Sequence, residues 1–411
     1  MFFPFAFSLF QIDNYAAEMV TNLQTMCAYK IFFIAAVCAT ASATQDDVSN
    51  LRRSAYTVPN EQHLDDEPTR RVFVKYRRNR RNAFQTELQQ RSSNTRINYD
   101  FKELDTFVVT IPESEVESLK GNPDVEVVRD DVPRYPQYIP ESAKRRRLQT
   151  NKEIIPYGID MVQARQVWKL GARGQNVTVC VVDTGVDSPH EDLMRVSGLD
   201  SNEMPWDDDG IGHGTHCGGI IAAAEGNRKG VVGVAPDANI FSVKVFSDSG
   251  GYAYSSGILA AAQQCVSNGA SVISMSLGGS LPNIFEIWGF RRILEEDNVL
   301  TVAAAGNAGN GLWSFPASYP GVISVGALDQ NKTIAPFSQY NRQVDIAAPG
   351  VDILSTFPMK APCTICDREG YDYGTISGTS MATPNIAGVL ALLKSFKPDA
   401  TPAELVDALL S

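Results

Sequence analysis

Five short apolar runs in the downstream part of the chain limit its fold more than any other feature. Their residues are almost continuously apolar instead of alternating with polar ones, which is typical of strands buried on both faces of a parallel sheet. The runs occupy residues 177–182, 240–246, 272–275, 299–304 and 322–325. Helix-like segments such as 214–224 and 256–267 lie between several of them. This order predicts an α/β domain of three layers with a mostly parallel sheet.

The upstream part of the chain predicts a second, smaller fold. Strand-like runs lie at 72–74, 107–109 and 125–128, and a helix-like stretch lies at 113–119. This is the pattern of a small α+β module. Residues 44 to about 68 are polar and contain prolines, so we expect a linker there. We interpret the basic run at 77–81 as a solvated face, with a nucleic-acid or membrane patch as the alternative.

The net charge of −11 is distributed unevenly. Residues 1–147 contain 20 Lys and Arg against 20 Asp and Glu, whereas residues 148–411 contain 16 against 27. Because phosphate binding requires clustered Lys and Arg, we expect no nucleic-acid partner for the downstream domain. An acidic surface mainly favours solubility, and we expect a monomer.

The N-terminal segment has the pattern of a secretion signal. Lys30 precedes an apolar run at 31–39, and Ala41-Ser42-Ala43 supplies small residues for cleavage after Ala43. We therefore assign residues 1–43 to a signal region, with Met26 as an alternative start, and expect a secreted, extracellular protein. The other interpretation is a buried core segment. The apolar run is shorter than the roughly 20 residues that span a bilayer, so no membrane anchor is expected.

Five of the seven cysteines remain after the predicted signal. Cys363 and Cys366 form a C-x-x-C, which in a secreted protein favours a local disulfide. A zinc site would need further ligands, and no second C-x-x-C or spaced pair of histidines is present. We interpret Cys180, in an apolar strand, and Cys217 as buried thiols, and leave Cys265 open.

Three separated motifs each offer one member of a nucleophilic triad. They are Val182-Asp183-Thr184-Gly185, Gly212-His213-Gly214-Thr215-His216 and Gly378-Thr379-Ser380-Met381-Ala382. A serine hydroxyl needs an adjacent base to attack a carbonyl, so only their combination carries weight. A carboxylate at a strand end, a histidine and a serine at a helix start fit a Ser-His-Asp site. The residues alone do not decide between His213 and His216 as the base.

The order Asp, His, Ser and the stretch Gly378-Thr379-Ser380-Met381-Ala382-Thr383-Pro384 resemble the subtilisin family over roughly residues 100–411. The resemblance implies a serine endopeptidase that hydrolyses protein and peptide bonds through an acyl-enzyme. It makes Asp183 the orienting carboxylate, His213 the base and Ser380 the nucleophile, with His216 a structural neighbour. Asn307, which follows an apolar strand, would donate to the oxyanion.

The same resemblance implies how substrate is held. Ser276, Leu277 and Gly278 would pair with the substrate backbone, and Gly306 would line the site. Glycines in this segment leave room for a large side chain, so we expect an apolar or aromatic residue before the cleaved bond and otherwise broad specificity. Tyr252 or Tyr254 would line a more distant pocket.

Structural calcium is implied by resemblance alone. Asp192 and Asn227 match side-chain ligands of a tight site in the family, and hard oxygen donors from loops suit Ca²⁺. Asp345, with the carbonyls of Pro320 and Val322, would form a second site. No catalytic cofactor is expected.

The upstream module resembles the subtilisin propeptide, which chaperones folding and then inhibits the enzyme. We therefore expect a zymogen in which residues 44–147 form a linker and inhibitory propeptide and residues 148–411 the peptidase domain. The junction is open: self-cleavage near Tyr135 to Tyr138, or cutting after the exposed basic run that ends at Arg147 by another protease.

The chain departs from the family pattern at two places. The family usually has His where this chain has Asn385, and family members normally continue beyond the position of Ser411.

Two other functions are possible for such a chain. An inactive scaffold would tolerate loss of triad residues, yet all four catalytic positions are present. An esterase-like hydrolase is disfavoured because Ala382 stands where its elbow motif requires Gly.

Overall fold

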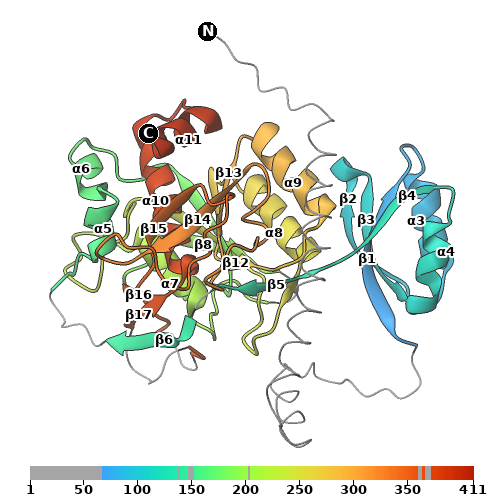
Figure 1. Cartoon of the computed structure of the whole chain (residues 1–411), viewed down its shortest axis with the longest axis horizontal. Coiled ribbons are helices and arrows are strands. Elements are labelled where there is room, and N and C mark those ends of the chain that lie inside the picture. The colour runs from blue at the N-terminus through green and yellow to red at the C-terminus, as the bar shows by residue number, and fades with distance from the viewer. Residues whose placement is uncertain (1–66, 138, 147–151, 202–203, 360–362, 366–371) are drawn as a thin grey trace, which may run out of the picture. The chain divides into compact units, whose positions relative to one another are not determined.

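The computed structural model describes residues 67–411 apart from 138, 147–151, 202–203, 360–362 and 366–371 (Figure 1). The predicted signal region and most of the predicted linker lie outside these residues. In the described part of the chain, no helix has the length and apolar character needed to cross a membrane.

The downstream domain is built on a seven-stranded sheet in which every pair of neighbours is parallel. Its order is β15 (Ile346–Pro349), β14 (Val322–Leu328), β13 (Leu300–Ala304), β11 (Val272–Met275), β7 (Thr178–Asp183), β9 (Asn239–Lys244) and β8 (Val196–Leu199). The five predicted apolar runs correspond to the five inner strands. The edge strands β8 and β15 were not predicted, because they are short and only partly buried.

Helices cover both faces of this sheet, as the continuous apolar strands predict. On one side α7 (His213–Ala222) and α10 (Thr379–Phe396) pack together, and on the other α8 (Ser255–Ser267) and α9 (Ile284–Glu295) pack together. Strand β7 separates the two pairs: Val179 and Val181 join the core cluster that contains residues of α7 and α10, while Cys180 between them bonds to α8. Successive strand residues point to opposite faces. The predicted three-layer α/β fold is therefore confirmed.

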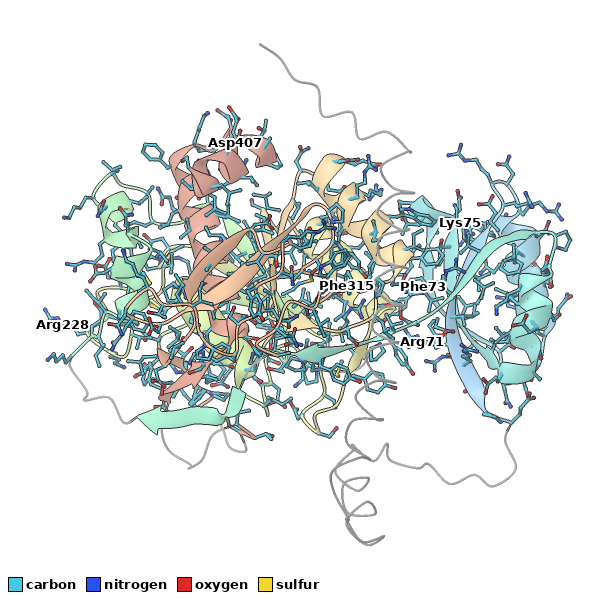
Figure 2. All side chains as sticks on the ribbon, viewed as in Figure 1. Arg71, Phe73, Lys75, Arg228, Phe315 and Asp407 are labelled. Carbon is cyan, nitrogen blue, oxygen red and sulfur yellow. A yellow bond between two sulfur atoms is a disulfide. The ribbon has the colours of Figure 1, made fainter. Side chains whose placement is uncertain are left out.

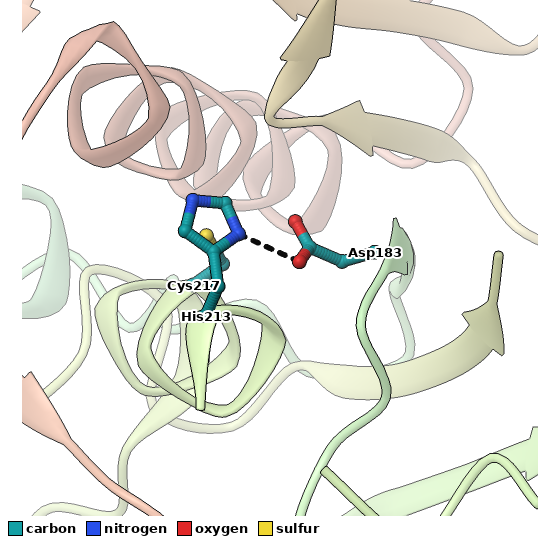
Figure 3. A group of neighbouring side chains, drawn as sticks. All are labelled: Asp183, His213 and Cys217. Atoms are coloured by element: carbon teal, nitrogen blue, oxygen red, sulfur yellow. Dashed lines mark hydrogen bonds and ion pairs between the residues drawn. The ribbon is translucent and has the colours of Figure 1, made fainter. Parts of the chain in front are cut away.

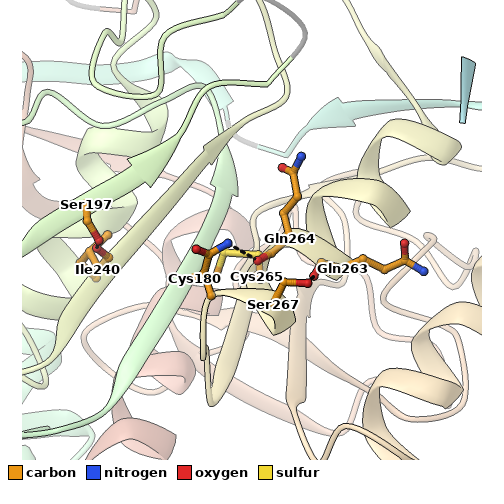
Figure 4. Close-up of a disulfide and its surroundings, with 8 residues drawn as sticks. Cys180, Ser197, Ile240, Gln263, Gln264, Cys265 and Ser267 are labelled. Carbon is orange, nitrogen blue, oxygen red and sulfur yellow. Dashed lines mark hydrogen bonds between the residues drawn. A yellow bond between two sulfur atoms is a disulfide. The ribbon is translucent and has the colours of Figure 1, made fainter.

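The bond between strand and helix is a disulfide, Cys180–Cys265 (Figure 4). The prediction that Cys180 is a buried thiol is wrong, and its partner is the cysteine left open. The two residues are 85 positions apart, and they meet only because α8 packs on β7. Cys217 is a buried free thiol, as predicted. Cys363 is disulfide-bonded, and Cys366 lies outside the described residues.

The N-terminal module (residues 69–130) is an antiparallel sheet with two helices on one face. The sheet order is β2 (Arg96–Phe101), β3 (Thr106–Pro112), β1 (Thr69–Tyr76) and β4 (Val125–Asp130), and the helices are α3 (Arg81–Gln90) and α4 (Val116–Lys120). Short 3₁₀ turns lie at Lys102–Leu104 and Glu113–Glu115. The predicted α+β order is confirmed, although β2 and α3 were missed. The basic run at 77–81 leads into α3.

The segment that follows the module forms two strands that pair with strands of the downstream domain. Strand β5 (Pro133–Pro136) lies between β10 (Ala253–Tyr254) and β12 (Leu277–Gly278), antiparallel to both. Strand β6 (Ile139–Arg146) pairs with β17 (Tyr373–Ser377), which pairs with β16 (Ile353–Thr356). The remaining helices are α5 (Tyr157–Met161), α6 (Ala164–Trp168) and α11 (Pro402–Leu410).

Candidate active site

Two predicted site residues meet at the carboxyl end of the sheet (Figure 3). Asp183 is the last residue of β7 and His213 is the first residue of α7. The His213 Nδ1 lies 2.6 Å from Asp183 Oδ1, and both side chains are buried. Asp183 Oδ1 also accepts the Thr184 backbone N–H at 2.8 Å. A carboxylate held in this way fixes the ring orientation and stabilises an imidazolium.

A second buried carboxylate, Asp209, holds the start of α7. It accepts hydrogen bonds from the Gly212 N–H (2.7 Å), the Thr215 N–H (2.8 Å) and the hydroxyls of Thr184 and Thr215. Carboxylates are stabilised at helix N-termini, where backbone N–H groups lack partners. Burial raises the pKa of Asp209 to about 6. Sequence reasoning missed this positioning residue, although it ends an acidic run just before the histidine motif.

The structure separates the two candidate histidines. His216 is completely buried, and its Nε2 lies 3.2 Å from the Gly374 carbonyl oxygen. Burial lowers the pKa of His216 to about 3, so the ring is neutral. Since the carboxylate pairs with His213, the geometry distinguishes two residues that the sequence left equivalent.

Ser380 lies in the first turn of α10, directly after Thr379. Its Oγ lies against two carbonyl oxygens, those of Gln137 and Ser276 (3.0 Å), and donates its single proton to one of them. The backbone N–H of Ser380 donates to the same Gln137 carbonyl at 3.2 Å. A backbone carbonyl from upstream in the chain thus lies against both the hydroxyl and the N–H of Ser380.

Cys217, on α7, contacts residues of all three motifs. Its Sγ, the Asp183 carboxylate and the His213 ring each offer an atom within 4.8 Å of the others (Figure 3). The same Sγ lies 3.7 Å from the carbonyl oxygen of Ser380. Burial raises the pKa of this thiol well above its ordinary value, so the thiol is protonated and packs as a small apolar side chain. The sulfur therefore lies beside the side chains of Asp183 and His213 and beside the backbone of Ser380.

Asn307 follows β13 and faces the start of α10. Its Oδ1 accepts both the backbone N–H and the hydroxyl of Thr379, each at 2.9 Å. These two bonds turn the amide so that Nδ2 is the free end, and this nitrogen is buried without a hydrogen-bond partner among the described residues. A buried unpaired donor is costly unless it serves a ligand. The orientation suits an oxyanion donor.

Backbone pairing of β5 places the Gln137 carbonyl at the serine. Pro136 is opposite Leu277, Tyr135 is opposite Gly278, and the Gln137 N–H donates to the Ser276 carbonyl at 3.0 Å. The segment predicted to bind substrate backbone therefore binds the chain's own upstream strand. Binding by addition of a strand is a common mode of peptide recognition.

Two of the predicted glycines have different roles. A Cβ on Gly278 would collide with Ser314 Oγ at 2.4 Å, so the glycine lets Ser314 pack here, and the Gln137 side chain lies within van der Waals reach at 3.4 Å. Gly306 has φ +110°, and a Cβ there would collide with Gln339. Its N–H donates to Thr379 Oγ1 at 3.2 Å, so Gly306 supports the loop that carries Asn307.

The N-terminal module docks on the downstream domain away from the serine. Phe73, Phe101 and Val108, on the face of its sheet opposite α3, share one apolar cluster with Leu259 of α8 and Phe285 of α9. We call these five residues the docking surface. The rings of Phe73 and Phe285 stack with centroids 4.8 Å apart. Arg71, Phe73 and Lys75 alternate along this face of β1 (Figure 2).

A buried acid strengthens the docking. Asp131 follows β4 and accepts hydrogen bonds from the Ser255 hydroxyl (2.8 Å) and the Ser256 N–H (2.9 Å) at the start of α8. Arg71 Nε lies 2.9 Å from the same carboxylate. A carboxylate at a helix N-terminus is favourable, and here one part of the chain caps a helix of another.

The predicted metal residues lie apart from the serine site. The Asp192 carboxylate is completely buried and accepts from Asn227 Nδ2 (2.6 Å) and the Val231 N–H (2.8 Å), both neutral. Burial raises the pKa of Asp192 to about 6. A divalent cation would supply the missing positive charge, and Asn227 would coordinate it once its amide turned its oxygen inward. Asp345 accepts the Ser324 N–H at 2.8 Å.

Comparisons with known proteins agree with this geometry. Residues 174–411 match the Subtilase family. The chain is 36% identical to M-protease from Shouchella clausii (strain KSM-K16) over 301 residues, 73% of this chain and 72% of that protein. It is 35% identical to Subtilisin NAT from Bacillus subtilis subsp. natto over 324 residues, 76% and 77% of the two chains. Subtilisin DY from Bacillus licheniformis is 36% identical over 268 residues, 63% of this chain and 91% of that protein.

Proposed function

The chain belongs to the subtilase family and is a subtilisin-type serine endopeptidase, and on this premise we propose that Asp183, His213 and Ser380 form its catalytic triad. The observation that carries the proposal is the Gln137 carbonyl, which lies against both the Oγ and the N–H of Ser380. In this arrangement Ser380 Oγ attacks the carbonyl carbon while His213 Nε2 takes its proton. Asp183 holds Nδ1–H and stabilises the charged ring.

The negative oxygen that forms during attack accepts hydrogen bonds from two donors. One is the Ser380 N–H, at the positive end of α10. The other is Asn307 Nδ2, which Thr379 holds by the opposite end of its amide. Collapse of the tetrahedral intermediate breaks the peptide bond, and His213 gives its proton to the leaving amine. Water then hydrolyses the acyl-enzyme by the same steps.

We propose that the protein is made as a zymogen that first cleaves itself between Gln137 and Tyr138. Of the two junctions open in the sequence, this bond is favoured because β5 brings its carbonyl to Ser380. The N-terminal module stays docked after the cut through the docking surface and Asp131, and so acts as an intramolecular inhibitor. Tyr138 and Arg147 lie outside the described residues.

Substrates would bind as β5 does, extended between β10 and β12, which makes the backbone the common element and the specificity broad. The expectation of an apolar residue before the cleaved bond remains a prediction. The chain's own residue at that position is Gln137, so the space beside Gly278 also accepts a long polar side chain.

The signal pattern at residues 1–43 supports an extracellular protease with the N-terminal module as its first partner.

The support for calcium is the buried carboxylate of Asp192, which lies next to Asn227 and has no positive charge bonded to it among the described residues. The Asp345 site rests on resemblance alone.

Labelling with a fluorophosphonate, which reacts with activated serines, tests the function. Matured wild-type protein should be labelled and should cleave a protein substrate. Ser380→Ala should lose both, because the chain then lacks its nucleophile. Ser377→Ala, which truncates a buried serine three residues earlier, is the matched control and should keep the label. Absence of label on the wild-type protein would favour an inactive scaffold instead.

A further inference from the structure

Arg134, in β5, is completely buried although arginine is a charged residue. Its neighbour Tyr135 points outward with 45% of its surface exposed. Counted from the peptide bond at Ser380, Arg134 is the fourth residue before the bond. Buried arginines are rare unless they are paired, so the pocket around this one must contain matching groups.

The partner is an acid of the downstream domain. Glu286, on α9, is also completely buried, and its Oε2 accepts hydrogen bonds from Arg134 Nη2 and from the hydroxyl of Tyr319 (2.7 Å). Tyr319 in turn accepts the Asn283 N–H at 2.7 Å, which fixes its orientation. Tyr319 and Asn283 belong to the downstream domain, so these bonds to Glu286 do not involve Arg134.

The pocket has the shape and the donors of a guanidinium site. Arg134 Nη2 reaches both Glu286 and Tyr319 (3.3 Å), while Nη1 donates to the Pro133 carbonyl at 2.9 Å. A Cβ on Gly279 would lie 3.0 Å from Nη1, so this glycine leaves the room that the group fills. A planar fork can meet these acceptors together, and an ammonium group cannot.

Release of the N-terminal module changes the electrostatics of this pocket. Arg134 departs with β5, but Glu286 remains on α9 with Oε1 lacking a hydrogen-bond partner among the described residues. Burial raises the pKa of Glu286. A buried carboxylate without its cation is costly. A substrate whose side chain restores the cation therefore gains binding free energy that a substrate with a neutral side chain does not.

We infer that Glu286 makes the mature enzyme select substrates with arginine four residues before the cleaved bond. This inference rests on the proposed function, because it assumes that substrates bind as β5 does. It adds a charged specificity determinant to a cleft that otherwise recognises backbone. Lysine should be accepted less well than arginine, and glutamate should be rejected because it would face Glu286.

The test uses matured wild-type enzyme and internally quenched peptides of residues 131–142, with Arg134 kept or replaced by Lys, Ala or Glu. The expected order of kcat/KM is Arg, Lys, Ala, Glu, with Arg over Ala by about tenfold or more. Glu286→Gln should collapse the ratio of Arg to Ala rates. Glu295→Gln, an exposed acid of the same helix, is the control and should leave that ratio unchanged.

The outcomes separate the two proposals. Equal cleavage of the Arg and Ala peptides by enzyme that still reacts with a fluorophosphonate would overturn the role of Glu286 alone. Failure to cleave any peptide, together with absence of label, would overturn the proposed function and this inference with it. Because the wild-type series needs no variant, the inference is testable even where Glu286→Gln does not fold.

Discussion

The upstream residues touch the downstream domain in two regions that differ in chemistry. The docking surface joins side chains of the module to α8 and α9, and it depends on which side chains these are. The cleft holds β5 through backbone pairs at Leu277, Gly278 and Ala253, which any extended peptide can form. The first region therefore recognises one partner, while the second accepts many and reads side chains at few positions. Inhibition and substrate choice should be separable by mutation.

The largest separable effect is expected in the cleft. Asn307→Ala removes an amide donor that would bond the substrate oxygen only in the transition state. The kcat should therefore fall by about 10²–10³-fold with KM nearly unchanged. Steady-state kinetics of the matured enzyme measure this. Asn310→Ala, in the same loop, is the control and should be near wild type. A large rise in KM alone would show that Asn307 binds substrate and not the transition state.

The docking surface should give the opposite result. Phe285→Ala removes the ring stacked on Phe73, and loss of a buried aromatic at an interface centre costs about 2 kcal/mol or more. The full-length chain should then show a lag between self-cleavage and onset of activity that is shorter by about 30-fold. The kcat of the fully active enzyme should change little.

Ile293→Ala is the control for that measurement. Ile293 is buried on the same helix but is not part of the docking surface. Its variant should keep the wild-type lag. If both variants shorten the lag equally, general loosening of α9 explains the result, and the comparison between the two regions fails.

The smallest effect is expected from a site outside both regions. If calcium binds at Asp192, a chelator should lower the Tm of the matured wild-type enzyme by about 5 °C or more. Asp192→Asn should remove this chelator dependence, while Asp345→Asn should keep most of it. An unchanged Tm after chelation would show that no bound calcium stabilises the enzyme.

The sequence predicted the parts of the site that depend on local signals. Continuous apolar strands, glycines around His213 and the serine at the start of α10 fixed the sheet class and the three motifs. What it missed depends on contacts between distant segments. Cys180 looked like a buried thiol because nothing near it in the sequence indicates α8, and nothing near Glu286 in the sequence indicates its partner Arg134, 152 positions away. The acid Asp209 was visible in the sequence, but its role needs the α7 terminus in place.

The central claim is that Ser380 cuts the chain after Gln137, and sequencing the new N-terminus tests it most directly. The full-length precursor is incubated as wild type and as Ser380→Ala, and the downstream fragment is sequenced at the first time point at which it appears. The account predicts a fragment that begins at Tyr138 from the wild type and an uncut chain from Ser380→Ala. A first fragment that begins after Arg147, or a Ser380→Ala chain cut at the same bond, would contradict it.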